Sequence, residues 1–303
     1  MDLLTLSLLS VFLYAVYVKA FKGVKQYERE EGLESHKVKN GTVTMGGIIF
    51  VLLPLFFIFY DPKVINIAIT IFLYGLLGFI DDLLIIIKKN NKGINPTLKL
   101  LLQVIIAGIS FFLYLNSEMA TKITIFNFQI DFKWLYGMLM LFLLTSSTNA
   151  FNLTDGVDGL CSGLCLLMSL GYLYISYKKE EYEIMNMIIV IMIPLFVFWC
   201  FNLPKAFLFM GDTGSLFLGA FYAMLSLYLD CLIPFIIMSL LFIFEVVSVI
   251  IQVFYFKRTN GKRIFKMTPF HHHLEACGYK EIEVDLIFYF IQIILIVIAL
   301  LLI

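Results

Sequence analysis

Ten apolar segments divide this chain, and their length restricts its fold more than any other feature. A helix needs about 20 predominantly apolar residues to cross the hydrocarbon core of a bilayer, and most of these segments approach that length. Of all residues 61% are apolar and 15% are charged, whereas a soluble domain is about half apolar. We therefore expect an all-α integral membrane protein with about ten transmembrane helices, in which residues 1–303 form one domain. The expected spans are residues 3–18, 46–60, 64–80, 98–115, 134–148, 160–177, 184–201, 215–229, 232–256 and 284–303.

Three of the segments and loops carry further information. The ninth span is long and contains Pro234, Glu245 and Gln252, so we expect it to bend or to leave the membrane. The first span is not a signal peptide, because it follows Asp2 instead of a basic stretch and is followed by lysines instead of a cleavage site. Residues 121–132 alternate apolar and polar side chains, which predicts a small β-hairpin between two spans.

The basic residues predict which side of the membrane each loop faces. An even number of spans puts both termini on the same side. The odd-numbered loops hold 17 of the 22 Lys and Arg residues. Because cytoplasmic loops are enriched in Lys and Arg, we expect the odd-numbered loops in the cytoplasm, with both termini and the hairpin on the outer side.

Five short polar segments contain nearly all of the unusual acids, amides and histidines. Each belongs to an odd-numbered loop or to its junction with a span, although none was used to derive the topology. We therefore expect all five at the cytoplasmic face, where a membrane protein that gathers carboxylates would carry out chemistry. The segments are residues 42–47 (TVTMGG), 78–82 (GFIDD), 149–159 (NAFNLTDGVDG), 209–215 (FMGDTGS) and 267–275 (MTPFHHHLE).

Two of these segments place several acids close together. Asp81 and Asp82 end an apolar run; adjacent carboxylates repel each other unless a cation or a shared proton separates them, so they are either functional or a solvated helix end. Asn152, Asp155 and Asp158 lie in a glycine-containing turn that presents oxygens. Such oxygens suit Mg²⁺ or the NH and OH groups of a nucleoside, although a plain polar loop is the alternative.

Asp212 lies between glycines just before the eighth span. The glycines leave backbone N–H groups accessible to a phosphate, and Thr213 or Ser215 can cap the following helix. The sequence around Asp212 has no P-loop lysine, which argues against a Walker-type nucleotide hydrolase. A helix cap without catalytic function is the alternative interpretation.

The three histidines His271, His272 and His273 lie in a loop rich in Lys and Arg. Neighbours on a helix point about 100° apart, so the three cannot all face one metal, and the HExxH motif of zinc proteases is absent from the sequence. They could bind phosphate or transfer protons, or form a polar surface loop. Glu245 in the ninth span is either a functional intramembrane carboxylate or a paired structural one.

Taken together, the residues indicate Mg²⁺-dependent phosphoryl chemistry at the membrane surface. Carboxylates bind the metal, the metal bridges a diphosphate, and cationic loops offset the remaining charge. The membrane setting implies that one substrate is a lipid.

NAFNLTDGVDGL, FMGDTGS and RIFKMTPFHHHLE carry a resemblance that extends from residue 42 to residue 281. The chain resembles the polyprenyl-phosphate N-acetylhexosamine-1-phosphate transferases, and its histidine segment resembles the phospho-N-acetylmuramoyl-pentapeptide transferase branch. The resemblance implies transfer of phospho-MurNAc-pentapeptide from UDP-MurNAc-pentapeptide to undecaprenyl phosphate, with release of UMP. It also implies a multi-pass protein of the bacterial cytoplasmic membrane that uses Mg²⁺. A homodimer is compatible with the resemblance, and no nucleic-acid partner is expected.

The resemblance also implies a role for individual residues. Asp81 and Asp82 would be the acidic pair near the lipid phosphate, Asp212 and Asn152 the metal ligands, and His271 a catalytic group with the sugar phosphate. The catalytic set is therefore Asp81, Asp82, Asp212 and His271, and the substrate-binding set is Lys39, Thr44, Lys99, Asn152, Asp155, Asp158, Asn202, Phe209, His271 and His272.

Three positions depart from the family pattern, and two other functions compete with it. Val43, Ile85 and Tyr279 replace a proline, a lysine and a tryptophan that are usual in the family. Because of Ile85, a diphosphate contact is either missing or supplied by Lys88 or Lys99.

The competing functions are the same transfer from UDP-GlcNAc, against which the histidine segment argues, and a proton-coupled transporter, which would more often place its carboxylates near the bilayer midplane.

Overall fold

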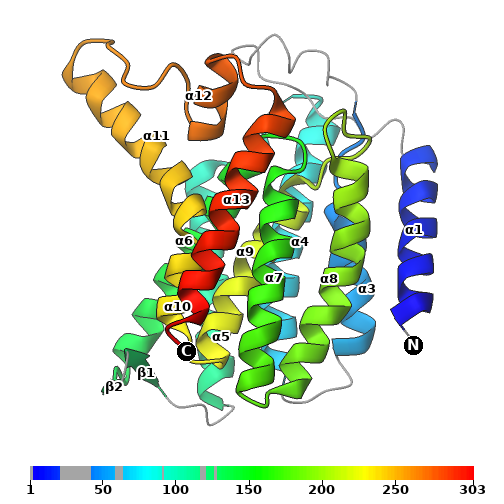
Figure 1. Cartoon of the computed structure of the whole chain (residues 1–303), viewed down its shortest axis with the longest axis vertical. Helices are drawn as coiled ribbons and strands as arrows, with labels where there is room; N and C mark the ends of the chain where they lie inside the picture. The colour runs from blue at the N-terminus through cyan, green and yellow to red at the C-terminus, as the bar shows by residue number, and fades with distance from the viewer. Residues whose placement is uncertain (1–2, 21–41, 59–63, 91, 117–120, 126–127) are drawn as a thin grey trace.

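The computed structural model describes residues 3–20, 42–58, 64–90, 92–116, 121–125 and 128–303, and within these ranges the protein is almost entirely helical (Figure 1). The helices form a bundle with most axes roughly parallel, and the two strands lie at one end of it. In chain order the elements are α1 (Leu3–Ala20), α3 (Gly47–Ile58), α4 (Ile65–Lys88), α5 (Pro96–Asn116), β1 (Lys122–Ile125), β2 (Phe128–Asp131), α6 (Leu135–Thr154), α7 (Leu160–Lys178), α8 (Tyr182–Asn202), α9 (Gly211–Tyr228), α10 (Leu232–Met238), α11 (Leu240–Arg258), α12 (Phe270–Ala276) and α13 (Glu281–Leu300).

Each predicted span falls on a helix, with differences at the ends. Within the described ranges, seven helices are long and apolar enough to cross a membrane by themselves: α1, α4, α5, α7, α8, α11 and α13. The number of spans and the side of each terminus stay predictions. Two ends were placed too early: α4 continues through Asp81 and Asp82 to Lys88, and α6 continues through Asn152 to Thr154. In both cases the helix extends past the apolar run because its polar side chains find partners inside the protein.

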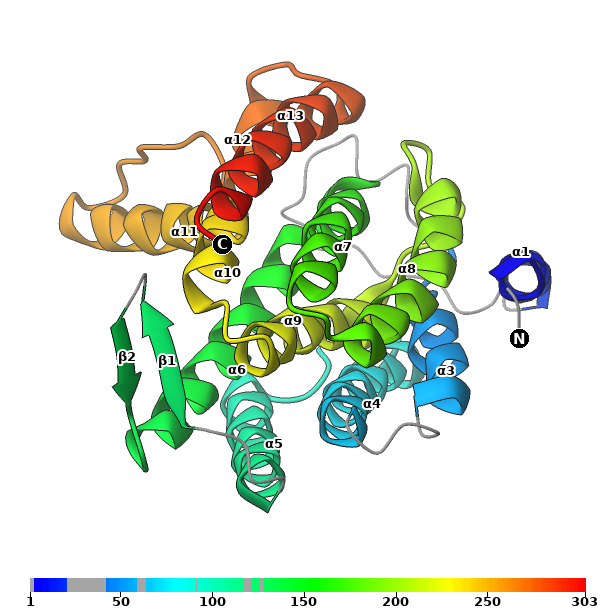
Figure 2. The ribbon, with the colours of Figure 1, turned by 60° about the horizontal axis from the view of Figure 1, so that its bottom comes forward.

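Helix α9 lies at the centre of the bundle (Figure 2). Every residue from Thr213 to Leu227 is buried, and the helix packs chiefly against α4, α6 and α3. Glycines permit this close approach: a Cβ atom added to Gly219 would stand 2.6 Å from the Cα of Thr148, and one added to Gly78 would overlap the backbone carbonyl of Asp212. Small residues of this kind let helix backbones pack tightly within a membrane, where the hydrophobic effect contributes little to the association of helices.

The predicted ninth span is broken at Ser239 into α10 and α11. α10 packs on α13 inside the bundle, whereas α11 leaves the bundle at an angle (Figure 1). The expected bend is therefore confirmed. α11 extends beside α12, and much of its apolar side-chain surface is exposed, including Ile250 and Phe254.

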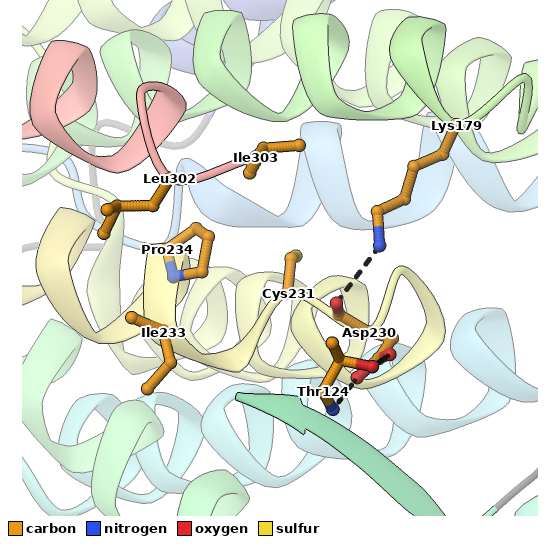
Figure 3. A pocket seen from close by; sticks show the side chains of 8 residues that line it. All are labelled: Thr124, Lys179, Asp230, Cys231, Ile233, Pro234, Leu302 and Ile303. Carbon is orange, nitrogen blue, oxygen red and sulfur yellow. Dashed lines mark hydrogen bonds between the residues drawn. The ribbon is translucent and has the colours of Figure 1, made fainter. Parts of the chain in front are cut away.

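The predicted hairpin is also confirmed: β1 and β2 pair antiparallel, with Lys122 opposite Asp131. It lies at the end of the bundle opposite α12 (Figure 1). Asp230 fastens it to the start of α10 by accepting a hydrogen bond from the Thr124 backbone N–H at 2.9 Å. A small pocket lies beside this contact, between the hairpin, the start of α10 and the last residues of the chain (Figure 3).

Candidate active site

The five polar segments are joined into one continuous region by contacts among their described residues. Residues 42–47 run beside residues 208–210: Phe209 N–H donates to the Val43 carbonyl at 2.9 Å and Gly46 N–H donates to the Phe209 carbonyl at 2.8 Å. The predicted gathering of these segments is confirmed. That they face the cytoplasm stays a prediction.

Asp82 on α4 caps the N-terminus of α9. Its Oδ1 accepts the Asp212 backbone N–H at 3.0 Å, and its Oδ2 accepts the Thr213 backbone N–H at 2.9 Å and the Thr213 hydroxyl at 2.7 Å. Gly211, at φ +72°, brings the backbone close enough for these bonds, since an added Cβ would overlap Asp82 Oδ2. The first N–H groups of a helix need such acceptors. Thr213 and Ser215, the two side chains that the sequence offered as caps of α9, do not cap it, because a carboxylate from another helix provides the cap.

Asp81 points away from Asp82 and takes part in a charged cluster. Lys99, at the start of α5, lies with its Nζ 3.0 Å from Asp81 Oδ2 and also forms an ion pair with Asp212 Oδ2. Asn152 Nδ2 donates to Asp212 Oδ1 at 2.6 Å and to the Ser215 hydroxyl at 2.9 Å. The repulsion expected between adjacent acids is therefore relieved by orientation, since neighbours on a helix diverge by about 100°, and by the Lys99 ammonium.

The structure distinguishes the two lysines that could replace the side chain missing at Ile85. Lys88 Nζ donates to the backbone carbonyls of Lys92 and Gly93, at 3.3 and 3.2 Å, so it holds the loop that follows α4. Lys99 instead lies between two site carboxylates. Of these two lysines, Lys99 is therefore the one whose ammonium lies in the candidate site.

Asn202 and Asp158 support the turn at residues 155–159. Asn202 Oδ1 accepts the Gly159 N–H at 3.0 Å, and its Nδ2 donates to the Leu208 carbonyl at 2.9 Å. Asp158 Oδ2 accepts the Ala206 N–H at 3.0 Å. Both side chains are buried. They join the turn to the segment that leads into Phe209, which gives them a structural role beside the substrate contact that the resemblance implies.

Asp155 differs from its neighbours. Its side chain is half-buried and has no hydrogen-bond partner among the residues that the structure describes. Removal from water raises the pKa of Asp155 well above its usual range, and the negative charges of Asp212, Asp82 and Asp158 raise it further. Asp155 is therefore one of the predicted oxygen ligands of this segment that is available to a bound molecule.

The three histidines have three different environments on α12, as their spacing requires. His271 is fully buried, His272 Nδ1 lies 2.7 Å from Glu275 Oε2, and His273 Nδ1 accepts the Lys266 N–H at 3.1 Å. A Cβ added to Gly156 would stand 2.5 Å from His271 Nε2 and 3.3 Å from His272 Nε2. His271 and His272 thus face the turn at residues 155–159, whereas His273 faces the loop before α12.

The remaining predicted residues lie at the edge of this region. Thr44 is buried, and its carbonyl accepts the Tyr17 hydroxyl at 3.0 Å. Phe209 is half-buried, with its backbone paired to Val43. Lys39 lies outside the described residues. Sequence reasoning missed that Thr213 and Ser215 orient Asp82 and Asn152, because hydroxyl groups near a helix start are common and carry no specific signal.

The side chains around Asp212 fit a Mg²⁺ ion that is held by few protein ligands, as in enzymes that transfer phosphate groups. Within the described ranges no group of three or more His, Cys, Asp or Glu side chains could hold a metal alone. Mg²⁺, however, is usually held by one or two carboxylates, with substrate phosphates and water completing its shell. Asp212 and Asp81 supply two carboxylates at a point that already accommodates the Lys99 ammonium. Asn152 turns its NH₂ group toward Asp212, so as placed it orients that ligand.

The chain is similar to known proteins along most of its length. The family model for glycosyl transferase family 4 matches residues 64–230. The phospho-N-acetylmuramoyl-pentapeptide-transferase of Enterococcus hirae is 36% identical over 291 residues, which cover 92% of this chain and 90% of the relative. The enzymes of the same name from Staphylococcus saprophyticus and Listeria innocua are 38% and 40% identical, covering 93% and 86% of this chain and 92% and 84% of the relatives. The UDP-GlcNAc and transporter alternatives are not favoured.

Proposed function

The chain belongs to the phospho-N-acetylmuramoyl-pentapeptide transferases of glycosyl transferase family 4, and from this membership we propose that it transfers phospho-MurNAc-pentapeptide from UDP-MurNAc-pentapeptide to undecaprenyl phosphate. The products are UMP and the first lipid intermediate of peptidoglycan. We propose that the reaction takes place at the cytoplasmic face of the bacterial inner membrane. The main structural support for the proposal is a charged cluster at the start of α9, which consists of Asp81, Lys99, Asp212 and Asn152.

The reaction requires one bond to form and one to break. An oxygen of the lipid phosphate attacks the β-phosphorus of the nucleotide sugar, and the bond from that phosphorus to the oxygen shared with the α-phosphate breaks, so that UMP leaves. The second pKa of a phosphomonoester is about 6, so the attacking phosphate is largely dianionic at neutral pH. Neither Asp81 nor Asp82 is therefore required as a base. Asp82 uses both of its oxygens to cap α9, which favours a positioning role for it.

The charged cluster has two tasks in this proposal. Lys99 offsets the negative charge that builds up as two phosphates approach each other. Asp212 and Asp81 would hold Mg²⁺, which when bound neutralises the diphosphate charge and so assists departure of the nucleotide. Asn152 and Asp82 fix the position of Asp212 from two sides. In this proposal His271 and His272, which lie beside Gly156, bind the sugar phosphate, and Phe209 and Asp155 bind the uridine.

The proposal is tested by UMP release from the purified protein in detergent, with undecaprenyl phosphate and Mg²⁺. UDP-MurNAc-pentapeptide and UDP-GlcNAc are compared side by side. We expect release with the muramoyl donor alone and loss of release when Mg²⁺ is chelated. Release with UDP-GlcNAc alone would retain the chemistry and overturn the proposed substrate.

The role of Asp212 is tested separately with Asp212→Asn. We expect this variant to lose UMP release by at least about 100-fold, together with its dependence on Mg²⁺, because the amide cannot replace a charged metal ligand. Its thermal stability in detergent is the control for folding. A folded variant with full activity would contradict the proposed role.

A further inference from the structure

Helix α11 carries two buried polar side chains that hold the histidine loop. Glu245 and Gln252 are seven residues apart, which is two helical turns, so they lie on the same face of α11. Gln252 Oε1 accepts the backbone N–H groups of Ile264 and Phe265, each at 3.0 Å, and its Nε2 donates to the Phe265 carbonyl at 3.0 Å. Gln252 therefore fixes the start of the segment that leads into α12.

Glu245 fixes the other end of the same segment. Its Oε2 accepts the Phe270 N–H at 2.6 Å and its Oε1 accepts the His271 N–H at 3.2 Å, at the first turn of α12. The side chain is 0% exposed. A buried carboxylate is costly unless hydrogen bonds compensate it, and the orphan N–H groups of a helix start provide that compensation. The structure therefore shows that Glu245 is paired, which is one of the two interpretations that the sequence left open.

Glu245 also contacts the His271 side chain. His271 Nδ1 lies 3.3 Å from Glu245 Oε2, although the contact is not aligned as a hydrogen bond. On the other side of the ring, Nε2 faces Gly156 and has no hydrogen-bond partner in the described part of the chain. A carboxylate only accepts hydrogen bonds, so its charge favours the proton on Nδ1 and leaves Nε2 as an acceptor toward the turn at residues 155–159.

We infer that Glu245 is a positioning residue for His271 in the phosphosugar transfer, an inference that rests on the proposed function. Glu245 holds the first turn of α12 against α11 and sets which ring nitrogen of His271 carries the proton. Among the described residues its carboxylate contacts Phe270 and His271, so its effect on the site passes through the first turn of α12. Gln252 holds the loop without contacting His271, which makes it a matched control.

A double-mutant cycle tests whether Glu245 acts through His271. Glu245→Met keeps the length of the side chain and removes both acceptors, and we expect UMP release to fall about 100-fold, since a catalytic group displaced by about 1 Å loses that much. In a His271→Asn background the same change is expected to cost no more than about twofold, because residues that act as a unit are non-additive. An equal loss in both backgrounds would overturn the inference.

Two further variants separate positioning from general stability. Gln252→Met also releases two backbone N–H groups of the loop, so we expect a similar loss of thermal stability but an activity loss about tenfold smaller than that of Glu245→Met. Glu245→Gln retains one acceptor oxygen and is expected to restore activity to within about fivefold of the unaltered protein. If Gln252→Met and Glu245→Met were equally inactive, the special role of Glu245 would be refuted.

Direct observation of the imidazole requires no variant at position 245. The chain has only four histidines, so ¹⁵N-histidine labelling gives few signals, and that of His271 is assigned from its loss in His271→Asn. In the neutral form of the ring, we expect the proton on Nδ1. A proton on Nε2 would overturn the inference. Because this measurement needs no turnover, it gives an answer even if the proposed substrates fail.

Discussion

Two helices at this site begin in the same way and differ in how firmly they are held. α9 and α12 each receive their N-terminal cap from a buried carboxylate on another helix, Asp82 on α4 and Glu245 on α11. In both, the second residue of the capped helix is a predicted functional one, Asp212 and His271. The protein thus uses the same device twice to place a side chain.

The surroundings of the two caps are different. α9 is buried along nearly its whole length and packs on α4, α6 and α3, whereas α12 is only seven residues long and packs on α11 and α13. Asp82 needs both oxygens, because each accepts a different backbone N–H. Glu245 Oε2 is within 3.4 Å of both N–H groups that it caps, so one oxygen can serve both.

This difference indicates what fixes the position of each functional side chain. Packing over many residues fixes the backbone around Asp212, and the cap mainly satisfies buried donors. A few hydrogen bonds from α11 fix the backbone around His271, so the cap itself determines the position. The Asp212 end of the site is therefore expected to be rigid, and the histidine end adjustable.

The largest effect is expected from replacing the capping carboxylate of α9 with an amide, which is the change that Glu245→Gln makes at the cap of α12. Asp82→Asn leaves one backbone N–H of Asp212 or Thr213 facing an amide NH₂ group, and each buried unsatisfied donor costs about 1–3 kcal/mol. We expect the free energy of unfolding in detergent to fall by about that amount and UMP release to fall about 100-fold as Asp212 moves. The matching Glu245→Gln change is expected to be much milder. If Asp82→Asn lost activity without losing stability, Asp82 would be a reacting group and the comparison would fail.

A smaller effect is expected where α12 meets the turn. Gly156→Ala places a Cβ 2.5 Å from His271 Nε2, and α12 can shift to accommodate it because it has few neighbours. We expect a stability loss below about 1 kcal/mol, less than the usual cost of overpacking, and a loss of UMP release of about tenfold. Activity and thermal unfolding are measured on the same preparation. A stability loss as large as that of Asp82→Asn would show that α12 is as firmly held as α9.

The smallest effect is expected at Ile85, where the family usually has lysine. Ile85→Lys adds an ammonium one turn after Asp81, but Lys99 already pairs with Asp81 and Asp212. A partly exposed ion pair contributes at most about 1 kcal/mol, so we expect UMP release to change by less than about fivefold. An increase well beyond that would mean that Lys99 does not compensate for Ile85.

The helices could be predicted from the sequence because length and apolar content decide them locally. The five polar segments could be found for the same reason, since acids and histidines between apolar runs are conspicuous. The partners of Asp82, Glu245 and Gln252 could not be predicted. A cap supplied from 130 residues away, as Asp82 supplies it to Asp212, leaves no local pattern. A single sequence therefore locates the candidate site but cannot separate the groups that would react from those that hold them.

The pairing of Val43 with residues 208 and 209 has a consequence for how the chain is made. A bacterial or eukaryotic ribosome adds about 5–20 residues per second, so the 165 residues between Val43 and Leu208 take roughly ten to thirty seconds to synthesise. Throughout that interval the N–H groups of Gly46 and Gly47 lack their final acceptors, and they cannot rest in lipid without them. The backbone at Gly46 and Gly47 must therefore stay in contact with water, while later helices enter the bilayer, before the site can close around α9.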